Sequence, residues 1–380
     1  MVITKFAIPE VISGHGSIEF VAKCALRLGA KRVFFVSDNG LEQSGWVDRV
    51  LDILDGNDLP AVYFDKVSSN PRDYQVHEGA DLYARERCDV IIALGGGSPM
   101  DAAKGIGTLV GNGGRIGDFE GANRIMCPLP PMILIPSTAG SGSDVSQFCI
   151  ITDVEREVKM SIISRSLVPN ISIIDPDLLL SKDADLILAS AIDAMAHAVE
   201  SYVSKLATPI TRMHSHKAIE LIVKNIQPAV EDKDTEALRQ LSIASTSAGM
   251  AFSNAGLGVL HSIAHSLGGM YDVLHGMVHP VLLPSVMRFN MRECTETMGT
   301  IGRIIAGARL CSDQQAALAG IDKLEELFAS LGVNQRLRDL LPDQSSIEQI
   351  CRVAIQDVCS LTNPRESSWR DLRGICEEAW

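Results

Sequence analysis

Two patterns of hydrophobic residues divide the chain. From the N-terminus to about residue 180, short apolar runs rich in β-branched residues alternate with amphipathic stretches. The clearest apolar runs are 33–37, 61–64, 90–94 and 132–136. The stretches between them predict helices near 17–28, 42–55, 74–87 and 99–110. Because the runs are apolar throughout rather than alternating, we expect parallel strands covered by helices on both faces, a doubly wound α/β domain.

After Asp175 and Pro176 the pattern changes to long stretches of Ala, Leu, Met, Glu and Lys with apolar residues at helical spacing. These stretches predict an all-helical second half. Proline disfavours helical backbone in the residue before it, so this pair is a plausible hinge. We therefore expect a Rossmann-like α/β domain over residues 1–182 and an all-α domain over residues 183–380.

Composition narrows the class of protein. The 380 residues carry a formal charge of −13 and show no basic cluster, which disfavours nucleic acid and anionic membranes as partners. The nine cysteines are scattered and never spaced C-x-x-C, as expected for reduced thiols in a cytosol. We find neither a leader peptide nor an apolar run of the roughly 18 residues that a membrane span needs, so we expect a soluble cytoplasmic protein.

Two glycine-rich turns follow predicted strands. Gly95, Gly96, Gly97, Ser98 and Pro99 come after the strand 90–94 and open a helix. Residues 136–144 form a second turn of small residues after the strand 132–136, with hydroxyls at Thr138 and Ser141. Both turns should reach the carboxyl edge of one sheet, where backbone amides and a helix N-terminus bind a dinucleotide pyrophosphate. Either turn alone could be purely structural. A third glycine cluster, 105–114, reads as a helix end and loop.

Asp38 follows the strand 33–37, where a carboxylate can accept hydrogen bonds from the adenosine ribose and repel a 2′-phosphate. This position favours NAD over NADP. An aspartate that makes a local turn with Asn39 and Gly40 explains the same residue equally well.

The helical half contains a group of metal-ligating residues. Asp193 and His197 lie four residues apart, as do His261 and His265, and His275 follows. That spacing places each pair on one face of a helix, in an apolar context where a carboxylate needs a cation or donors. A carboxylate with imidazoles suits Zn²⁺ or Fe²⁺, and five such residues exceed four ligands, so one has another role. By contrast, His77, His214 and His216 lie among polar residues and should be solvated.

At this point the chain resembles the iron-containing, or group III, alcohol dehydrogenases, whose fold is also that of dehydroquinate synthase. The resemblance covers nearly the whole chain and rests on the motifs at 95–104, 138–144, 193–204 and 255–269. It implies the metal ligands Asp193, His197, His261 and His275, with His265 as a catalytic histidine near the nicotinamide. It implies a substrate pocket that includes Phe148, Cys149 and Phe252. The implied cofactor contacts are Asp38, Asn70, Gly96, Gly97, Ser98, Asp101, Thr138, Ser141 and Lys159.

The chain departs from the family pattern at several positions. Ser141 and Asp144 stand where threonine and glutamate are usual, and Ala191 and Ile192 replace a Gly-Met pair. His279 occupies a position that is commonly asparagine. It is either an extra polar group near the metal or a helix-end residue.

The resemblance implies an NAD(H)-dependent alcohol dehydrogenase and aldehyde reductase, a homo-oligomer, with Fe²⁺ or Zn²⁺ as Lewis acid and hydride transfer to or from nicotinamide. A small primary alcohol or C2–C4 aldehyde is the expected substrate; ethanol, 1,3-propanediol, lactaldehyde and sulfonated or phosphonated two-carbon aldehydes all stay open. The alternatives are a zinc polyol dehydrogenase of the glycerol type, a dehydroquinate-synthase-like lyase, and a protein that binds metal and NAD without catalysis. The lyase normally uses a glutamate with two histidines, so Asp193 argues against it.

Overall fold

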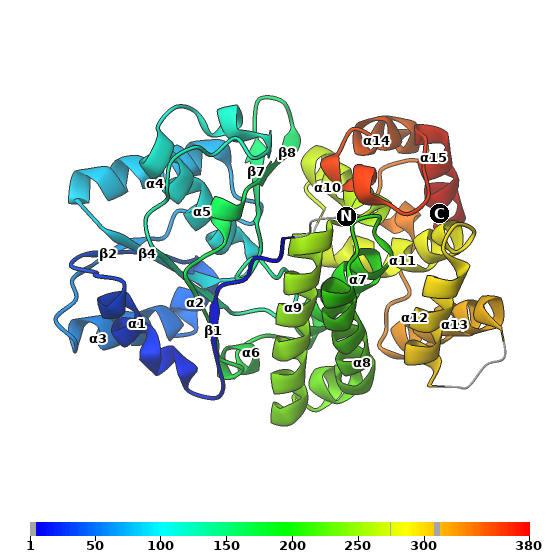
Figure 1. Ribbon diagram of the computed structural model, residues 1–380, viewed down its shortest axis with the longest axis horizontal. Coiled ribbons are helices and arrows are strands. Elements are labelled where there is room, and N and C mark those ends of the chain that lie inside the picture. Colours follow the sequence, from blue (N-terminus) through cyan, green and yellow to red (C-terminus); the bar gives the residue numbers. More distant parts are fainter. Residues whose placement is uncertain (1–4, 274, 308–311) are drawn as a thin grey trace. The chain divides into compact units, whose positions relative to one another are not determined.

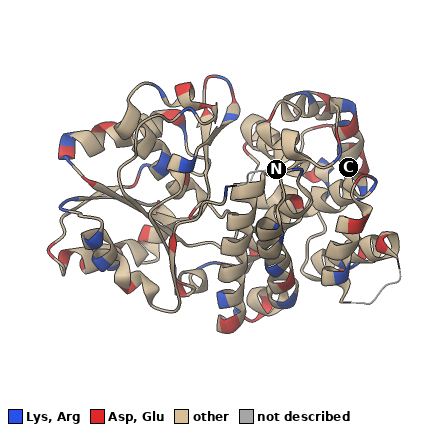
Figure 2. Ribbon diagram, viewed as in Figure 1, with Lys and Arg blue, Asp and Glu red and all other residues tan. Residues whose placement is uncertain are grey.

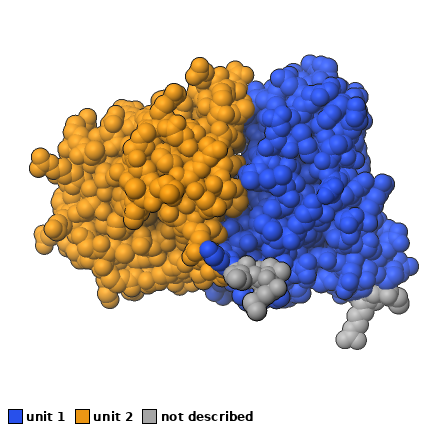
Figure 3. Space-filling model, turned by 45° about the horizontal axis from the view of Figure 1, so that its top comes forward, with its two compact units in different colours: residues 1–5, 184–380 blue, residues 6–183 orange. Residues whose placement is uncertain are grey.

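The computed structural model describes residues 5–273, 275–307 and 312–380. The chain divides into two compact units, Phe6–Asp183 and Ala184–Trp380, the second of which also includes Lys5. Figure 3 colours Phe6–Asp183 orange, as its unit 2, and the C-terminal residues blue, as its unit 1; below, the first unit is Phe6–Asp183 and the second unit is the C-terminal one. The division falls one residue from the boundary expected at residue 182.

The first unit is built on a six-stranded parallel sheet in the order β1-β9-β6-β4-β2-β3. The four predicted strands are present as β2 (Val33–Val36), β3 (Ala61–Phe64), β4 (Val90–Gly95) and β6 (Met132–Pro136). Two further strands, β1 (Glu10–Ser13) and β9 (Ile171–Ile174), were not predicted. The chain goes outward from β2 to β3 and returns to the other side of β2 with β4, so the strand order reverses between β2 and β4.

Helices cover both faces of this sheet (Figure 1). Neighbouring residues of β2 show it: Phe34 packs in one hydrophobic cluster with residues of α4 and α5, whereas Phe35 packs in another with residues of α1 and α3. The expectation of a doubly wound domain is therefore confirmed. Its helices are η1 (Ser17–Phe20), α1 (Val21–Arg27), α2 (Asn39–Gln43), α3 (Trp46–Asp55), α4 (Asp73–Glu86), α5 (Gly97–Asn112), η2 (Ile116–Phe119), η3 (Arg165–Leu167) and α6 (Asp177–Leu180).

Two features of this unit differ from the sequence expectation. A second, three-stranded sheet joins β5 (Gly121–Ala122), β8 (Val158–Ile163) and β7 (Phe148–Asp153), with β7 and β8 antiparallel. The glycine cluster 105–114 was read as a helix end and loop, but α5 continues to Asn112 and contains most of it. Close packing explains the glycines, because a Cβ on Gly111 would lie 2.5 Å from the carbonyl oxygen of Pro128.

The second unit is helical throughout the part that the structure describes, as predicted. Its N-caps follow known chemistry: the hydroxyl of Thr208 accepts a hydrogen bond from the amide of Thr211, and Pro209 occupies the first turn of α8. The helices are α7 (Ala184–Val203), α8 (Pro209–Glu231), α9 (Thr235–Ala255), α10 (Val259–Tyr271), α11 (His275–Met291), α12 (Thr295–Ala306), α13 (Asp313–Ser330), η4 (Leu337–Asp339), α14 (Ser346–Ala354), η5 (Val358–Thr362) and α15 (Trp369–Glu378).

Helix α7 bears on the expectation that no apolar run is as long as a membrane span requires. Among the described residues it is the one helix whose length and apolar composition would allow it to cross a membrane. However, 83% of its most apolar window is buried inside the protein, as in the core helix of a globular unit. Charged residues are spread over both units, with Lys and Arg interspersed with Asp and Glu (Figure 2).

Candidate metal centre and nucleotide site

Three helices of the second unit each contribute two polar side chains that are four residues apart and therefore on one helix face. The pairs are Asp193 and His197 in α7, His261 and His265 in α10, and His275 and His279 in α11. All six side chains come from one unit, and most of the apolar residues that separate them along each helix are buried in its core. The sequence had revealed the first two pairs, and the third repeats the same spacing.

The carboxylate of Asp193 is the centre of the cluster. Its Oδ1 lies 2.9 Å from Nδ1 of His279, 3.8 Å from Nε2 of His197 and 3.9 Å from Nε2 of His261. One potential ligand atom from each of Asp193, His261 and His279 lies within 4.8 Å of the others. All three residues are buried.

The remaining imidazoles pack around this core. The ring of His197 stacks on that of His261, with centroids 4.5 Å apart. The ring of His275 lies 4.9 Å from that of His279 and 6.0 Å from that of His261. The structure thus brings together the four residues expected as metal ligands and adds His279, which was not among them.

The donor atoms of this cluster fit a divalent cation. Asp193 Oδ1, His261 Nε2 and both ring nitrogens of His279 are buried and make no hydrogen bond of ordinary geometry, and the one short contact among them is the 2.9 Å ion pair between Asp193 Oδ1 and His279 Nδ1. Buried polar atoms are normally paired, because leaving them unpaired costs free energy. One carboxylate and several imidazoles are the donors that Fe²⁺ and Zn²⁺ prefer. A cation bound among them would satisfy these atoms together.

Electrostatics within the cluster point the same way. Burial alone would raise the pKa of Asp193, but the imidazoles of His197, His261 and His279 hold it well below its ordinary value. Burial alone would lower the pKa of His261, but the carboxylates of Asp193 and Glu200 raise it to about 9. The site therefore attracts positive charge into a buried position.

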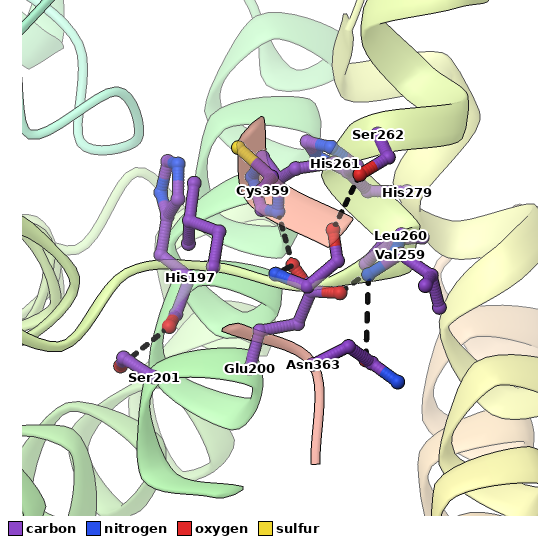
Figure 4. A network of polar contacts seen from close by, with 12 residues as sticks. His197, Glu200, Ser201, Val259, Leu260, His261, Ser262, His279, Cys359 and Asn363 are labelled. Atoms are coloured by element: carbon purple, nitrogen blue, oxygen red, sulfur yellow. Dashed lines mark hydrogen bonds and ion pairs between the residues drawn. The ribbon is translucent and has the colours of Figure 1, made fainter. Parts of the chain in front are cut away.

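Glu200, about one turn after His197 in α7, contacts the His261 side of the cluster (Figure 4). Its fully buried carboxylate accepts hydrogen bonds from the amides of Gly258, at 2.9 Å, and Leu260, at 2.8 Å, and lies 2.6 Å from Nδ1 of His261. These amides belong to the N-terminus of α10, where a negative charge is stabilised by the helix dipole. Glu200 thus fixes both the start of α10 and the orientation of His261.

A close helix contact positions the third pair. Gly276, next to His275 at the start of α11, lies against Ala189 of α7, and a Cβ there would be 2.6 Å from the Cβ of Ala189. A larger residue would force the first turn of α11 away from α7. The glycine therefore lets His275 and His279 reach the turn of α7 that carries Asp193.

His265 has a different environment from its neighbours. Its Nδ1 lies 2.8 Å from Oδ2 of Asp357, whose Oδ1 accepts a hydrogen bond from the amide of Cys359 at 2.8 Å. Burial alone would raise the pKa of Asp357, but His265 lowers it. Asp357 therefore orients the His265 ring, which stacks on His275 with centroids 5.2 Å apart.

In the first unit the two glycine turns converge as expected. Strands β4 and β6 are neighbours, and the amide of Ser137 donates to the carbonyl of Gly95 at 2.8 Å. A Cβ on Gly97 would lie 3.2 Å from the Cβ of Ser141, so a side chain there would have to push Ser141 away by a few tenths of an ångström. The first turn opens α5 at Gly96 and follows β4, beside the reversal of strand order where ligands bind in open α/β sheets.

Other predicted cofactor residues border these turns. The amide of Asn70 donates to Oγ of Ser98 at 3.3 Å, and Thr138 lies close enough that a Cβ on Gly96 would be 3.5 Å from it. Asp38 follows β2 on the other side of the reversal. It is the N-cap of α2 and accepts from the amide of Leu41 at 3.1 Å, so the local explanation of this residue is correct, whatever its part in cofactor binding.

Two predicted cofactor residues have environments of their own. Asp101 is buried, accepts from the amide of Ile150 at 3.2 Å, and has its pKa raised to about 6 by burial. This contact ties α5 to β7, so Asp101 orders the framework of the site. Lys159 lies on β8, opposite Thr152 of β7.

The predicted pocket residues are not gathered within one unit. Phe148 and Cys149 begin β7 in the first unit, where the buried thiol of Cys149 donates to the carbonyl of Asp101 at 3.2 Å. Phe252 belongs to α9 in the second unit and stacks on His197, with centroids 4.3 Å apart. Cys149 thus has a packing role, and its pocket role stays a prediction.

Two family models match this chain, one in each of its two units. The model of the iron-containing alcohol dehydrogenases matches residues 9–176, and that of the C-terminal part of the Fe-containing alcohol dehydrogenase family matches residues 187–380. The chain belongs to the iron-containing alcohol dehydrogenase family. The resemblance read from the motifs is therefore confirmed.

Individual members of this family match along their whole length. The chain is 36% identical to an NAD-dependent methanol dehydrogenase of Bacillus methanolicus, covering 99% of this chain and 100% of the relative. It is 32% identical to a lactaldehyde reductase of Escherichia coli, covering 97% of each. A crystal structure of a 1,3-propanediol oxidoreductase superposes with a TM-score of 0.97 at 36% identity, covering all of both chains.

Proposed function

We propose that this chain is an NAD(H)-dependent, metal-dependent alcohol dehydrogenase that interconverts a small primary alcohol and its aldehyde. The observation that carries the proposal is the cluster around Asp193, where buried carboxylate and imidazole atoms face one another without hydrogen bonds of ordinary geometry. Membership of the iron-containing alcohol dehydrogenases supports Fe²⁺ as the resident cation, with Zn²⁺ as the alternative that the same donors accept.

Each group has a distinct task in this proposal. A divalent cation held by Asp193 and the surrounding histidines would supply Lewis-acid polarisation of a carbonyl oxygen, and NAD(H) would carry the hydride. Asp193 supplies the negative charge that holds the cation in a buried position. Glu200 keeps His261 in one orientation.

His265 is our proposed proton-transfer residue. Asp357 occupies its Nδ1, which leaves Nε2 to exchange a proton with the substrate oxygen, directly or through the nicotinamide ribose. In the first unit, the amides of Gly96 and Gly97 at the N-terminus of α5 would hold the cofactor pyrophosphate, with the hydroxyls of Ser98, Thr138 and Ser141 beside them.

For the substrate we propose a small primary alcohol or its C2–C4 aldehyde. The relatives are named for methanol, 1,3-propanediol and lactaldehyde, all small molecules with one to three carbons. We further propose that the enzyme is cytoplasmic and that it works as a homo-oligomer. Size-exclusion chromatography with light scattering would test the oligomeric state.

The proposal is tested by NADH oxidation with a panel of C2–C4 aldehydes, using protein loaded anaerobically with Fe²⁺ or Zn²⁺. We expect turnover with at least one aldehyde and its loss in Asp193→Asn. His216→Asn, an exposed histidine of α8, is the matched control and should keep full activity. Absence of turnover with every aldehyde, in protein that holds a stoichiometric cation, would contradict the proposed reaction.

A further inference from the structure

His279 stands out among the histidines of the chain. Its side chain is fully buried, and neither ring nitrogen makes a hydrogen bond of ordinary geometry, although Nδ1 lies beside the carboxylate of Asp193. A histidine that serves only as core packing normally satisfies at least one nitrogen, since burying an imidazole without a partner costs free energy. His279 therefore needs an explanation other than packing.

The position of the ring supplies one. Nδ1 of His279 lies 2.9 Å from Oδ1 of Asp193, the shortest separation between Asp193 and any of the three imidazoles paired with it. Two ligand atoms at ~2.1 Å from one cation are about 3.0 Å apart at a right angle and about 3.4 Å apart at the tetrahedral angle. The 2.9 Å pair is therefore close to the separation of two ligands that share an ion. The ring centroid is also 4.6 Å from that of His261.

The surrounding helices hold His279 in this position. It lies one turn after His275 in α11, on the same helix face, and Gly276 brings that turn against α7. Pro280 and Pro284 follow it in the same helix and are buried with it. The ring is fully buried, with its Nδ1 beside Asp193.

We propose that His279 is itself a ligand of the cation, through Nδ1, in a set that includes Asp193 and His261. This inference rests on the proposed function only in requiring that the second unit binds a divalent cation. It changes the chemistry of the site, because an imidazole at a position that is commonly asparagine in this family adds a nitrogen donor. More nitrogen donors favour Zn²⁺, Co²⁺ and Fe²⁺ over Mn²⁺ and Mg²⁺.

The test uses Co²⁺ as a spectroscopic probe of the full-length protein. Apoprotein is titrated with Co²⁺ under anaerobic conditions, and the visible absorption bands and the hyperfine-shifted, exchangeable imidazole N–H signals in the proton NMR spectrum are recorded. Two variants are compared with wild type: His279→Asn, which introduces the residue common in the family, and His279→Gln, which keeps more of the volume. His216→Asn is again the control.

We expect both His279 variants to bind Co²⁺ at least tenfold more weakly, to change the visible bands, and to lose one shifted N–H signal. The control should match wild type in all three readings. The inference is overturned if a folded His279 variant keeps the wild-type Co²⁺ affinity, bands and number of shifted signals. If the His279 variants give this result and wild type turns over aldehydes, only the inference about His279 fails. If wild type binds no Co²⁺, the proposed metal site itself fails.

Discussion

Glu200 and His261 form a buried carboxylate–imidazole pair, with 2.6 Å between Oε2 and Nδ1. Because the carboxylate already accepts two backbone N–H bonds, Nδ1 of His261 carries the hydrogen of this third bond. The other nitrogen, Nε2, is then the one that faces Asp193. A carboxylate behind a histidine ligand fixes the ring and increases its basicity, and removing it commonly costs 10–100-fold in metal affinity.

The first prediction concerns this pair. In Glu200→Gln the side-chain NH₂ group must face at least one N–H group whose hydrogen bond the carboxylate accepted. A buried donor is then left unpaired. We expect Co²⁺ and Zn²⁺ affinity, measured by competition with a chelator, to fall by roughly 10–100-fold. Glu231→Gln, an exposed residue at the end of α8, is the control. Wild-type metal affinity in Glu200→Gln would show that Glu200 has no part in the site.

The second prediction separates proton transfer from metal binding. His265→Ala should lower kcat by about 10²–10⁴-fold, which is the usual contribution of general acid–base catalysis. Asp357→Asn should lower kcat by about 10-fold, because the asparagine still accepts the hydrogen bond from the amide of Cys359 but loses the charge that holds His265. Metal content, measured by inductively coupled plasma mass spectrometry, should stay at the wild-type level. Loss of the metal in His265→Ala would instead make His265 a ligand.

The third prediction concerns the choice between NAD and NADP. Asp38→Asn removes the negative charge yet keeps an oxygen that can accept from Leu41, so α2 retains its N-cap. We expect the ratio of kcat/KM for NADPH to that for NADH to rise by at least tenfold, since the carboxylate no longer repels a 2′-phosphate. An unchanged ratio, with the protein folded, would mean that Asp38 only caps the helix.

The fourth prediction concerns the resident metal. Protein purified in air should have low activity that ferrous iron restores under anaerobic conditions, because oxidised iron is held differently by carboxylate and imidazole ligands. Chelation should abolish activity, and the melting temperature should fall, since a cation that binds only the folded state stabilises it. Full activity in chelator-treated protein shown to be free of metal would contradict a metal-dependent reaction.

The sequence predicted the elements whose signal is local. Strands such as β4 are continuous apolar runs bounded by turn residues, and the long helices carry their own periodicity. By contrast, β1 is a partly exposed edge strand, and β9 lies between β1 and β6 in the sheet. Their pairing depends on contacts about 160 residues apart in the chain, which no local pattern records.

The same distinction separates the parts of the site. Asp193, His197 and His261 were found because residues four apart share a helix face. Glu200 was missed because its partners lie in another helix, 61 residues beyond it in the case of His261. One signal was available: apart from Asp193, Glu200 is the only carboxylate between residues 186 and 204, so a buried face had to accommodate it. Asp357 offers no such signal, because it meets His265 across 92 residues.

The central claim is that one divalent cation binds at the Asp193 cluster, and anomalous diffraction tests it most directly. Crystals of iron-loaded protein should be measured on both sides of the iron absorption edge. We predict a single strong anomalous peak per chain, within about 2.4 Å of a carboxylate oxygen of Asp193 and of Nε2 of His261. A peak elsewhere in the chain, or none in crystals whose iron content is stoichiometric, would contradict the account.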